Sequence, residues 1–137
     1  MDGYRHRIMD SLLEKKLQAK GAVLIEGPKW CGKTTTAEEV AASKILLART
    51  DVKSNFKSLL EIDTDAALSG DTPMLIDEWQ TVPKLWDAVR YTVDHRRKMG
   101  QFILTGSAVP DKEAEEEREH SGTGRFAWLT MRPMTLF

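Results

Sequence analysis

One stretch limits the fold of this 137-residue chain more than any other, the run G-P-K-W-C-G-K-T at residues 27–34. It matches the template G-x-x-x-x-G-K-[ST] at every defined position. The run follows the apolar segment A-V-L-I at 22–25 and opens a segment, 34–42, with an apolar face at helical spacing. A strand that passes through a glycine-rich turn into a helix is the context in which this motif binds phosphate. The sequence therefore predicts a phosphate-binding loop (Walker A).

The chemistry of phosphate binding explains the residue types in this run. Gly27 and Gly32 allow backbone amides to point inwards, and the following helix adds its positive N-terminal end. Lys33 places a positive charge between the β- and γ-phosphates, and the Thr34 hydroxyl can coordinate Mg²⁺. The sequence leaves the base preference open: the chain has no guanine-reading N-K-x-D pattern, and adenine is only the default. The predicted ATP-binding residues are Gly27, Pro28, Lys29, Trp30, Cys31, Gly32, Lys33, Thr34 and Thr35.

A second apolar run, M-L-I at 74–76, ends in Asp77 and Glu78. Ligands of an open parallel sheet collect at the carboxyl ends of its strands. We expect Asp77 to hold Mg²⁺ through a coordinated water and Glu78 to deprotonate an attacking water. The alternative is a solvated acidic strand end. Gln80 either assists by hydrogen bonding or caps a turn, and the sequence does not choose.

Two further groups are candidates for catalysis together with Lys33 and Glu78. Thr105 and Ser107 follow the apolar run at 101–104, and either could touch the γ-phosphate or the attacking water. A turn built from small residues explains either one equally well.

Arg125 precedes the last predicted strand and is a candidate arginine finger, in this subunit or a neighbour. Arg118 and Arg132 compete for that role, and a solvated arginine is the more common finding.

The remaining pattern alternates strands with helices. Apolar runs predict strands at 22–25, 45–47, 74–76, 101–104 and 126–131. Helical spacing predicts helices around 8–17, over 34–42 and from Pro83 to about 93. Residues 48–72 are expected to form a polar loop with one short helix around Phe56, Leu59 and Leu60, and residues 111–120 a solvated helix or loop. Continuous apolar strands alternating with helices indicate a parallel sheet covered on both faces, an α/β fold.

Composition and charge exclude several classes of protein. The formal net charge of -1 gives no global field that calls for nucleic acid, although the basic cluster at 95–98 leaves a nucleic-acid patch as an alternative to simple charge at a helix end. No apolar run is long enough to span a membrane. A single cysteine and three histidines without metal spacing argue against disulfides and zinc. We expect a cytoplasmic protein.

Four blocks in order resemble a family of bacterial and archaeal ATPases related to the AAA+ class. They are G-A-V-L-I-E-G-P-K-W-C-G-K-T-T-T-A, L-I-D-E-W-Q-T-V-P-K-L-W-D, F-I-L-T-G-S-A and H-S-G-T-G-R-F-A-W-L-T-M-R-P-M-T-L-F. The resemblance implies a parallel sheet of about five strands between helices (AAA+/ASCE type), with Lys33 and Thr34 at the phosphates and metal and Asp77 and Glu78 as the acidic pair. It also implies an N-terminal ATPase domain followed by a C-terminal domain of uncharacterised function.

We therefore expect residues 1–137 to be one P-loop ATPase domain and the first part of a longer protein, since the chain stops at the apolar run R-P-M-T-L-F. Self-association or a protein partner would then involve the absent part. The predicted function is Mg²⁺-dependent ATP hydrolysis. The alternatives are a slow, nucleotide-gated regulatory module, a small-molecule kinase, against which the Asp77-Glu78 pair argues, and a nucleic-acid motor.

Overall fold

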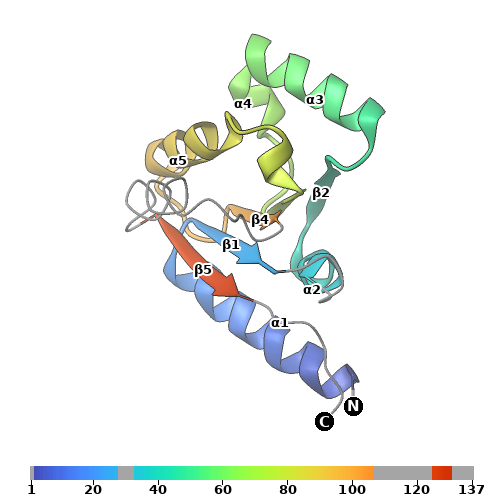
Figure 1. Ribbon diagram of the computed structural model, residues 1–137. Coiled ribbons are helices and arrows are strands. Elements are labelled where there is room, and N and C mark those ends of the chain that lie inside the picture. The colour runs from blue at the N-terminus through green and yellow to red at the C-terminus, as the bar shows by residue number, and fades with distance from the viewer. Residues whose placement is uncertain (1, 28–32, 107–124, 131–137) are drawn as a thin grey trace, which may run out of the picture.

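The computed structural model describes residues 2–27, 33–106 and 125–130 (Figure 1). In chain order the elements are α1 (Asp2–Ala19), β1 (Ala22–Glu26), α2 (Lys33–Val40), β2 (Ser43–Leu46), α3 (Thr50–Ile62), α4 (Thr64–Ala67), β3 (Met74–Asp77), the short 3₁₀ helix η1 (Trp79–Thr81), α5 (Leu85–Arg96), β4 (Phe102–Gly106) and β5 (Phe126–Thr130).

The five strands form one sheet in the order β2-β3-β4-β1-β5. Every neighbouring pair is parallel. This confirms the predicted α/β fold with a parallel sheet, and the observed strand limits lie within two residues of the predicted ones. Every residue of β3 and β4 is buried, as continuous apolar runs predict for strands covered on both faces.

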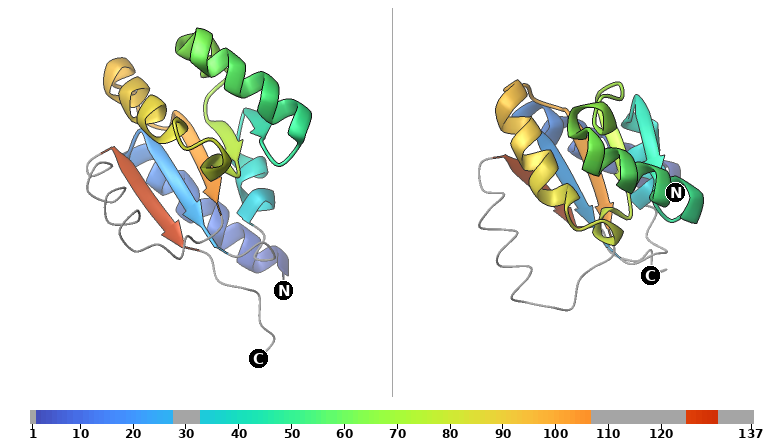
Figure 2. Two further views of the ribbon diagram at one scale, coloured as in Figure 1. Left: turned by 45° about the horizontal axis from the view of Figure 1, so that its top comes forward. Right: turned by 90° about the horizontal axis from the view of Figure 1, so that it is seen from above.

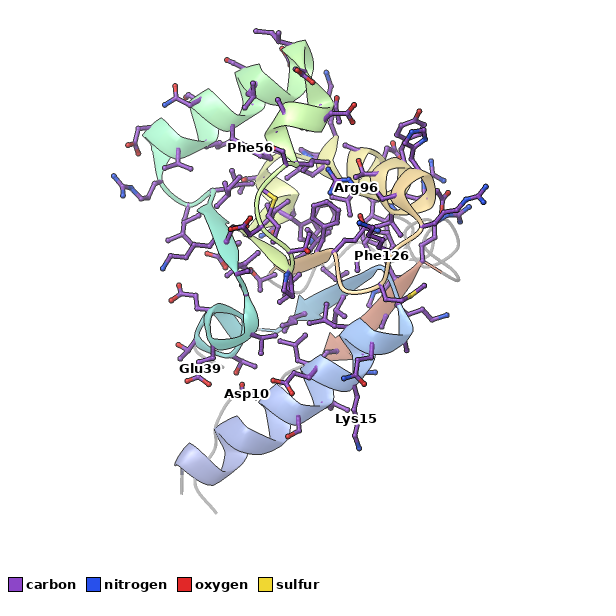
Figure 3. All side chains as sticks on the ribbon, turned by 180° about the vertical axis from the view of Figure 1, so that it is seen from behind. Asp10, Lys15, Glu39, Phe56, Arg96 and Phe126 are labelled. Carbon is purple, nitrogen blue, oxygen red and sulfur yellow. The ribbon has the colours of Figure 1, made fainter. Side chains whose placement is uncertain are left out.

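Alternate strand residues bury two separate cores, which makes the domain three layers thick. On β1, Ala22 and Leu24 join the core beneath α3, α4 and α5, while Val23 and Ile25 join the core beneath α1 and α2. Figures 1 and 2 show α1 and α2 on one side of the sheet and α3 to α5 on the other. Phe56 and Phe126 lie on the α5 side of the sheet in Figure 3, and Asp10 and Glu39 lie on the α1 and α2 side.

Aromatic side chains hold α5 against the edge strand β5. The rings of Trp86 and Phe126 stack with their centroids 4.1 Å apart. Trp79 and Trp128 also pack against Trp86, at 5.4 and 6.0 Å. Trp79, Trp86 and Phe126 are buried, so this aromatic cluster is part of the α5-side core.

The segment 48–72 was predicted as an irregular loop with one short helix around Phe56, Leu59 and Leu60. The helix is confirmed, but the loop prediction for most of the remaining residues is wrong. The segment forms the thirteen-residue helix α3 and the short helix α4. Phe56 and Leu60, one helical turn apart, bury one face of α3, so its many polar residues are the solvent face of a helix. Asp63 then begins α4, because its side chain accepts a hydrogen bond from the Ala66 N–H at 3.2 Å. A single stripe of two buried side chains is therefore enough to pack α3 against the domain.

Two other predicted segments are the helix that follows Pro83 and the charged segment 111–120. Pro83 was expected in the first turn of a helix, but α5 begins two residues later, at Leu85, after a turn in which the Trp86 N–H donates to the Pro83 carbonyl. The charged segment 111–120 lies outside the described residues.

Candidate nucleotide-binding site

Three neighbouring strands end together at the carboxyl edge of the sheet. The pairing register aligns Ile25 of β1 with Thr105 of β4, and Thr105 with Asp77 of β3. Just beyond this line, the Gly27 N–H donates to the Gly106 carbonyl at 3.3 Å. The first glycine of the predicted phosphate loop therefore lies beside the end of β4, next to the acidic end of β3.

The predicted loop connects β1 to α2, as a phosphate-binding loop requires. Glu26 ends β1 and Lys33 begins α2. A helix N-terminus at this position presents free backbone N–H groups and a partial positive charge to the loop. Pro28, Lys29, Trp30, Cys31 and Gly32 lie outside the described residues, as do the side chains of Lys33 and Thr34. Thr35, the last predicted ATP-binding residue, is exposed on α2.

Asp77, Thr105 and Glu78 form a chain of hydrogen bonds across two strands. The Thr105 hydroxyl donates to Asp77 Oδ1 at 2.5 Å, and both residues are buried. The same hydroxyl oxygen accepts the Glu78 backbone N–H at 3.4 Å. A hydroxyl carries one hydrogen. Thr105 therefore holds the Asp77 carboxylate and the Glu78 backbone. The choice between Thr105 and Ser107 as the phosphate contact stays a prediction, since Ser107 lies outside the described residues.

Glu78 lies at a sharp turn of the backbone directly after β3. Its dihedral angles, φ 57° and ψ 46°, are in the left-handed region that non-glycine residues seldom adopt. The turn is closed by Thr81, whose N–H and hydroxyl both donate to the Glu78 carbonyl, at 3.1 and 2.9 Å. Strained backbone of this kind is concentrated at active sites and ligand-binding turns.

Gln80 contacts the carboxylate of Glu78. The sequence had left open whether Gln80 assists by hydrogen bonding or caps a turn. Its side-chain amide Nε2 donates to Glu78 Oε2 at 2.6 Å. Gly106 leaves the space for this arrangement, because a Cβ at that position would lie 2.7 Å from Gln80 Oε1 and 3.0 Å from Trp79 Nε1. The signal in the sequence was the spacing of Glu78 and Gln80, which does not by itself show that the two side chains meet.

Arg125 is not near these residues. Its carbonyl accepts the N–H of Ala22, the first residue of β1, and its guanidinium pairs with Asp94 of α5, Nε to Oδ1 at 2.5 Å. It lies at the amino edge of the sheet, about 13 Å of strand away from the carboxyl edge. The structure therefore does not bring Arg125 to the site of its own chain, and a role as a finger in a neighbouring subunit stays a prediction. Arg118 and Arg132 lie outside the described residues.

Part of the basic cluster 95–98 has contacts within the domain. The Arg96 guanidinium donates from Nη2 to the Leu68 carbonyl at 3.0 Å and lies over the Phe102 ring, 5.9 Å from its centroid. His95 stacks on Tyr91, one helical turn before it in α5. These contacts give His95 and Arg96 a structural explanation that needs no nucleic acid.

No group of three or more histidine, cysteine, aspartate or glutamate side chains within the described residues is arranged to hold a metal. No helix in the described part of the chain combines the length and the apolar character of a membrane span.

The family model described as an AAA domain matches residues 19–137, which is most of the chain. This chain belongs to that AAA domain family. It is therefore a nucleotide-binding domain of the ATPase type, and the sequence between β1 and α2 is the part of it that matches the phosphate-loop template.

This chain is similar to two curated mycobacterial proteins and to one solved structure. Uncharacterised proteins of Mycobacterium tuberculosis and Mycobacterium bovis are each 33% identical over 100 residues, a match that covers 72% of this chain and 22% of each relative. The chain thus spans about a fifth of the length of these relatives. The structure of C. elegans PCH-2 aligns with a TM-score of 0.49 and 16% identity, over 96% of this chain and 42% of that one.

Proposed function

We propose that this AAA domain binds ATP with Mg²⁺ and hydrolyses it to ADP and phosphate. The observation that carries the proposal is the Asp77–Thr105–Glu78 hydrogen-bond chain at the carboxyl edge of the sheet. It lies beside the strand that leads into the phosphate-loop sequence. Ligands of open parallel sheets bind at this edge.

The residues present fit a magnesium–nucleotide complex. Mg²⁺ prefers hard oxygen ligands and retains several waters, and Asp77 supplies a carboxylate whose orientation is held by Thr105. Thr34 is the second oxygen donor in the proposal, and Lys33 with the backbone amides of residues 28–34 binds the phosphates. When bound, the metal would neutralise charge on the β- and γ-phosphates.

Glu78 is the proposed general base. Its carboxylate would accept a proton from the attacking water, while the water oxygen forms a bond to the γ-phosphorus and the bond to the ADP oxygen breaks. Glu78 directly follows Asp77 in the sequence, and its backbone is held by Thr105 and by the turn at residues 78–81. In the proposal the base and the metal ligand are therefore adjacent but distinct.

Turnover of the purified domain with Mg-ATP tests this proposal. Replacing the base in Glu78→Gln should lower the rate of phosphate release by about 10²- to 10⁴-fold while ATP binding persists. Lys33→Ala should instead weaken binding, because it removes the charge at the phosphates. Binding without turnover in the unchanged protein, or an undiminished rate in Glu78→Gln, would contradict hydrolysis by this residue.

A slow nucleotide-gated module is the second candidate, and the contact between Gln80 and Glu78 favours it. A base whose oxygen is already bonded at 2.6 Å could turn over slowly until that bond opens. In that case, removing Gln80 would accelerate phosphate release. Release of phosphate without any added acceptor would separate both candidates from a small-molecule kinase.

A further inference from the structure

We propose that Gln80 is a positioning residue for hydrolysis, which fixes the orientation of the Glu78 carboxylate, and that Gly106 provides the space for it. This inference rests on the proposed function, in which Glu78 activates water. It assigns to Gln80 a role that acts through Glu78 rather than on the nucleotide itself.

The first argument is that the turn does not need the Gln80 side chain. The backbone between Glu78 and Val82 is already closed by Thr81 donating to the Glu78 carbonyl and by Val82 N–H donating to the Trp79 carbonyl at 3.0 Å. The Gln80 amide bonds to a side chain, not to the backbone. Turn capping therefore does not explain this glutamine.

The second argument comes from the other end of the same amide. A carboxylate at neutral pH only accepts hydrogen bonds, so the atom that meets Glu78 is Nε2 and the amide oxygen points away. Gln80 Oε1 is buried, and no hydrogen-bond partner for it is found within the described ranges. A buried acceptor without a partner costs stability. The contact with Glu78 is therefore kept although it leaves the other end of the amide without a partner among the described residues.

The third argument is the fit of Gly106 to this pair. Any larger residue at the end of β4 would place a Cβ 2.7 Å from Gln80 Oε1, closer than side-chain atoms pack. Glycine at this position thus allows the amide to reach Glu78. A general base must stay within hydrogen-bonding reach of its water, and long side chains keep that geometry only when neighbouring groups hold them.

Steady-state kinetics of Gln80→Leu test the inference. We expect kcat for Mg-ATP to fall by about tenfold to a hundredfold, the loss that a misplaced catalytic group causes, with KM within about twofold of the original. Gly106→Ala should lower kcat in the same direction because it displaces the amide. Gln80→Glu, which puts a second carboxylate beside Glu78, should reduce kcat at least as much as Gln80→Leu.

Gln101 offers a matched control in the same chain. It too has a buried Oε1 for which no partner is found among the described residues, and its Nε2 donates to the Lys98 carbonyl at 2.7 Å, just before β4 begins at the amino edge. Gln101→Leu therefore removes the same groups far from Glu78. We expect its kcat to stay within about twofold of the original.

A double-mutant cycle separates a positioning role from a general structural one. If Gln80 acts through Glu78, Gln80→Leu should cause no further loss in the Glu78→Gln background. An equal loss in both backgrounds would overturn the inference, as would a kcat for Gln80→Leu that is unchanged or raised. A raised kcat would favour the gated module.

NMR spectroscopy can detect the contact between Gln80 and Glu78 without any ATP turnover. The chain has three glutamines, of which Gln18 is exposed on α1, so ¹⁵N-glutamine labelling gives three side-chain amide signals with a built-in solvent reference. Glu78→Ala should move the Gln80 signal and speed its hydrogen exchange, while the Gln101 signal stays in place. An unmoved Gln80 signal would overturn the inference about Gln80 but leave the proposed function intact. A protein that binds ATP but never hydrolyses it would overturn both.

Discussion

Thr105 contributes one hydroxyl hydrogen to the site, and the structure directs that hydrogen to Asp77. This donor stabilises the buried carboxylate, because a charged group away from water is costly unless it is hydrogen-bonded. At the scale of single residues, the acidic pair is therefore organised by a neighbour on the adjacent strand, 28 residues further along the chain.

The contribution of this hydroxyl can be measured with Thr105→Val, which keeps the shape of the side chain. We expect the free energy of unfolding in urea to fall by about 1–3 kcal/mol, and more Mg²⁺ to be needed for half-maximal turnover.

Thr92→Val is the matched control for that change, since Thr92 is equally buried and its hydroxyl donates to the Ala88 carbonyl within α5 at 2.8 Å. A hydroxyl bonded back along its own helix contributes little or nothing, so this variant should stay near the original stability. Equal losses for the two valines would show that the bond to Asp77 has no special weight.

At the scale of elements, α5 and β5 are held together by rings rather than by ions. Trp86 stacks on Phe126 and also contacts Trp79 and Trp128. The nearby pair of Arg125 and Asp94 is partly exposed, and such ion pairs contribute little to stability. The packing of α5 on this side of the sheet therefore depends on the aromatic cluster.

Trp86→Ala should lower the free energy of unfolding by about 3–5 kcal/mol, because it leaves a cavity in the α5-side core. Tyr91→Ala on the same helix serves as the control, since Tyr91 is 64% exposed and its loss should change stability by no more than about 0.5 kcal/mol. Both values follow from urea unfolding. Comparable losses at the two positions would contradict the assignment of the core.

At the scale of the whole molecule, nucleotide binding should stabilise the fold. The predicted phosphate loop follows β1 and the acidic pair ends β3, with β4 between these two strands, so a bound nucleotide would tie β1, β4 and β3 together at one edge. Binding to the native state only, at a concentration about a hundredfold above Kd, raises the free energy of unfolding by about 2.7 kcal/mol.

Thermal unfolding with and without Mg-ATP measures this gain. We expect ATP with Mg²⁺ to raise Tm, EDTA to remove part of the rise, and Lys33→Ala to abolish it. A parallel titration with GTP tests whether adenine is preferred. No rise in Tm with any nucleotide, in a protein that is folded, would argue against the site.

Much of the fold could be predicted because its signals are local. The phosphate-loop motif needs its residues within eight consecutive positions, and buried parallel strands appear as continuous apolar runs, so β1, β3 and β4 were found close to their observed limits. The length of helix α3 was underestimated because only Phe56 and Leu60 mark its buried face, and the polar remainder resembles a loop.

The sequence by itself determined that a run matching the phosphate-loop template precedes a helix and that an acidic pair ends a later strand, and it predicted the parallel strands correctly. Only the tertiary structure decided which side chains meet. Thr105 reaches Asp77 because β3 and β4 are neighbours in register, and Gln80 reaches Glu78 because the turn bends back over Gly106. Arg125 lies at the other edge because a residue that precedes a parallel strand lies at the opposite end of the sheet from one that follows it. Motifs depend on spacing along the chain, whereas contacts between motifs depend on strand order and register.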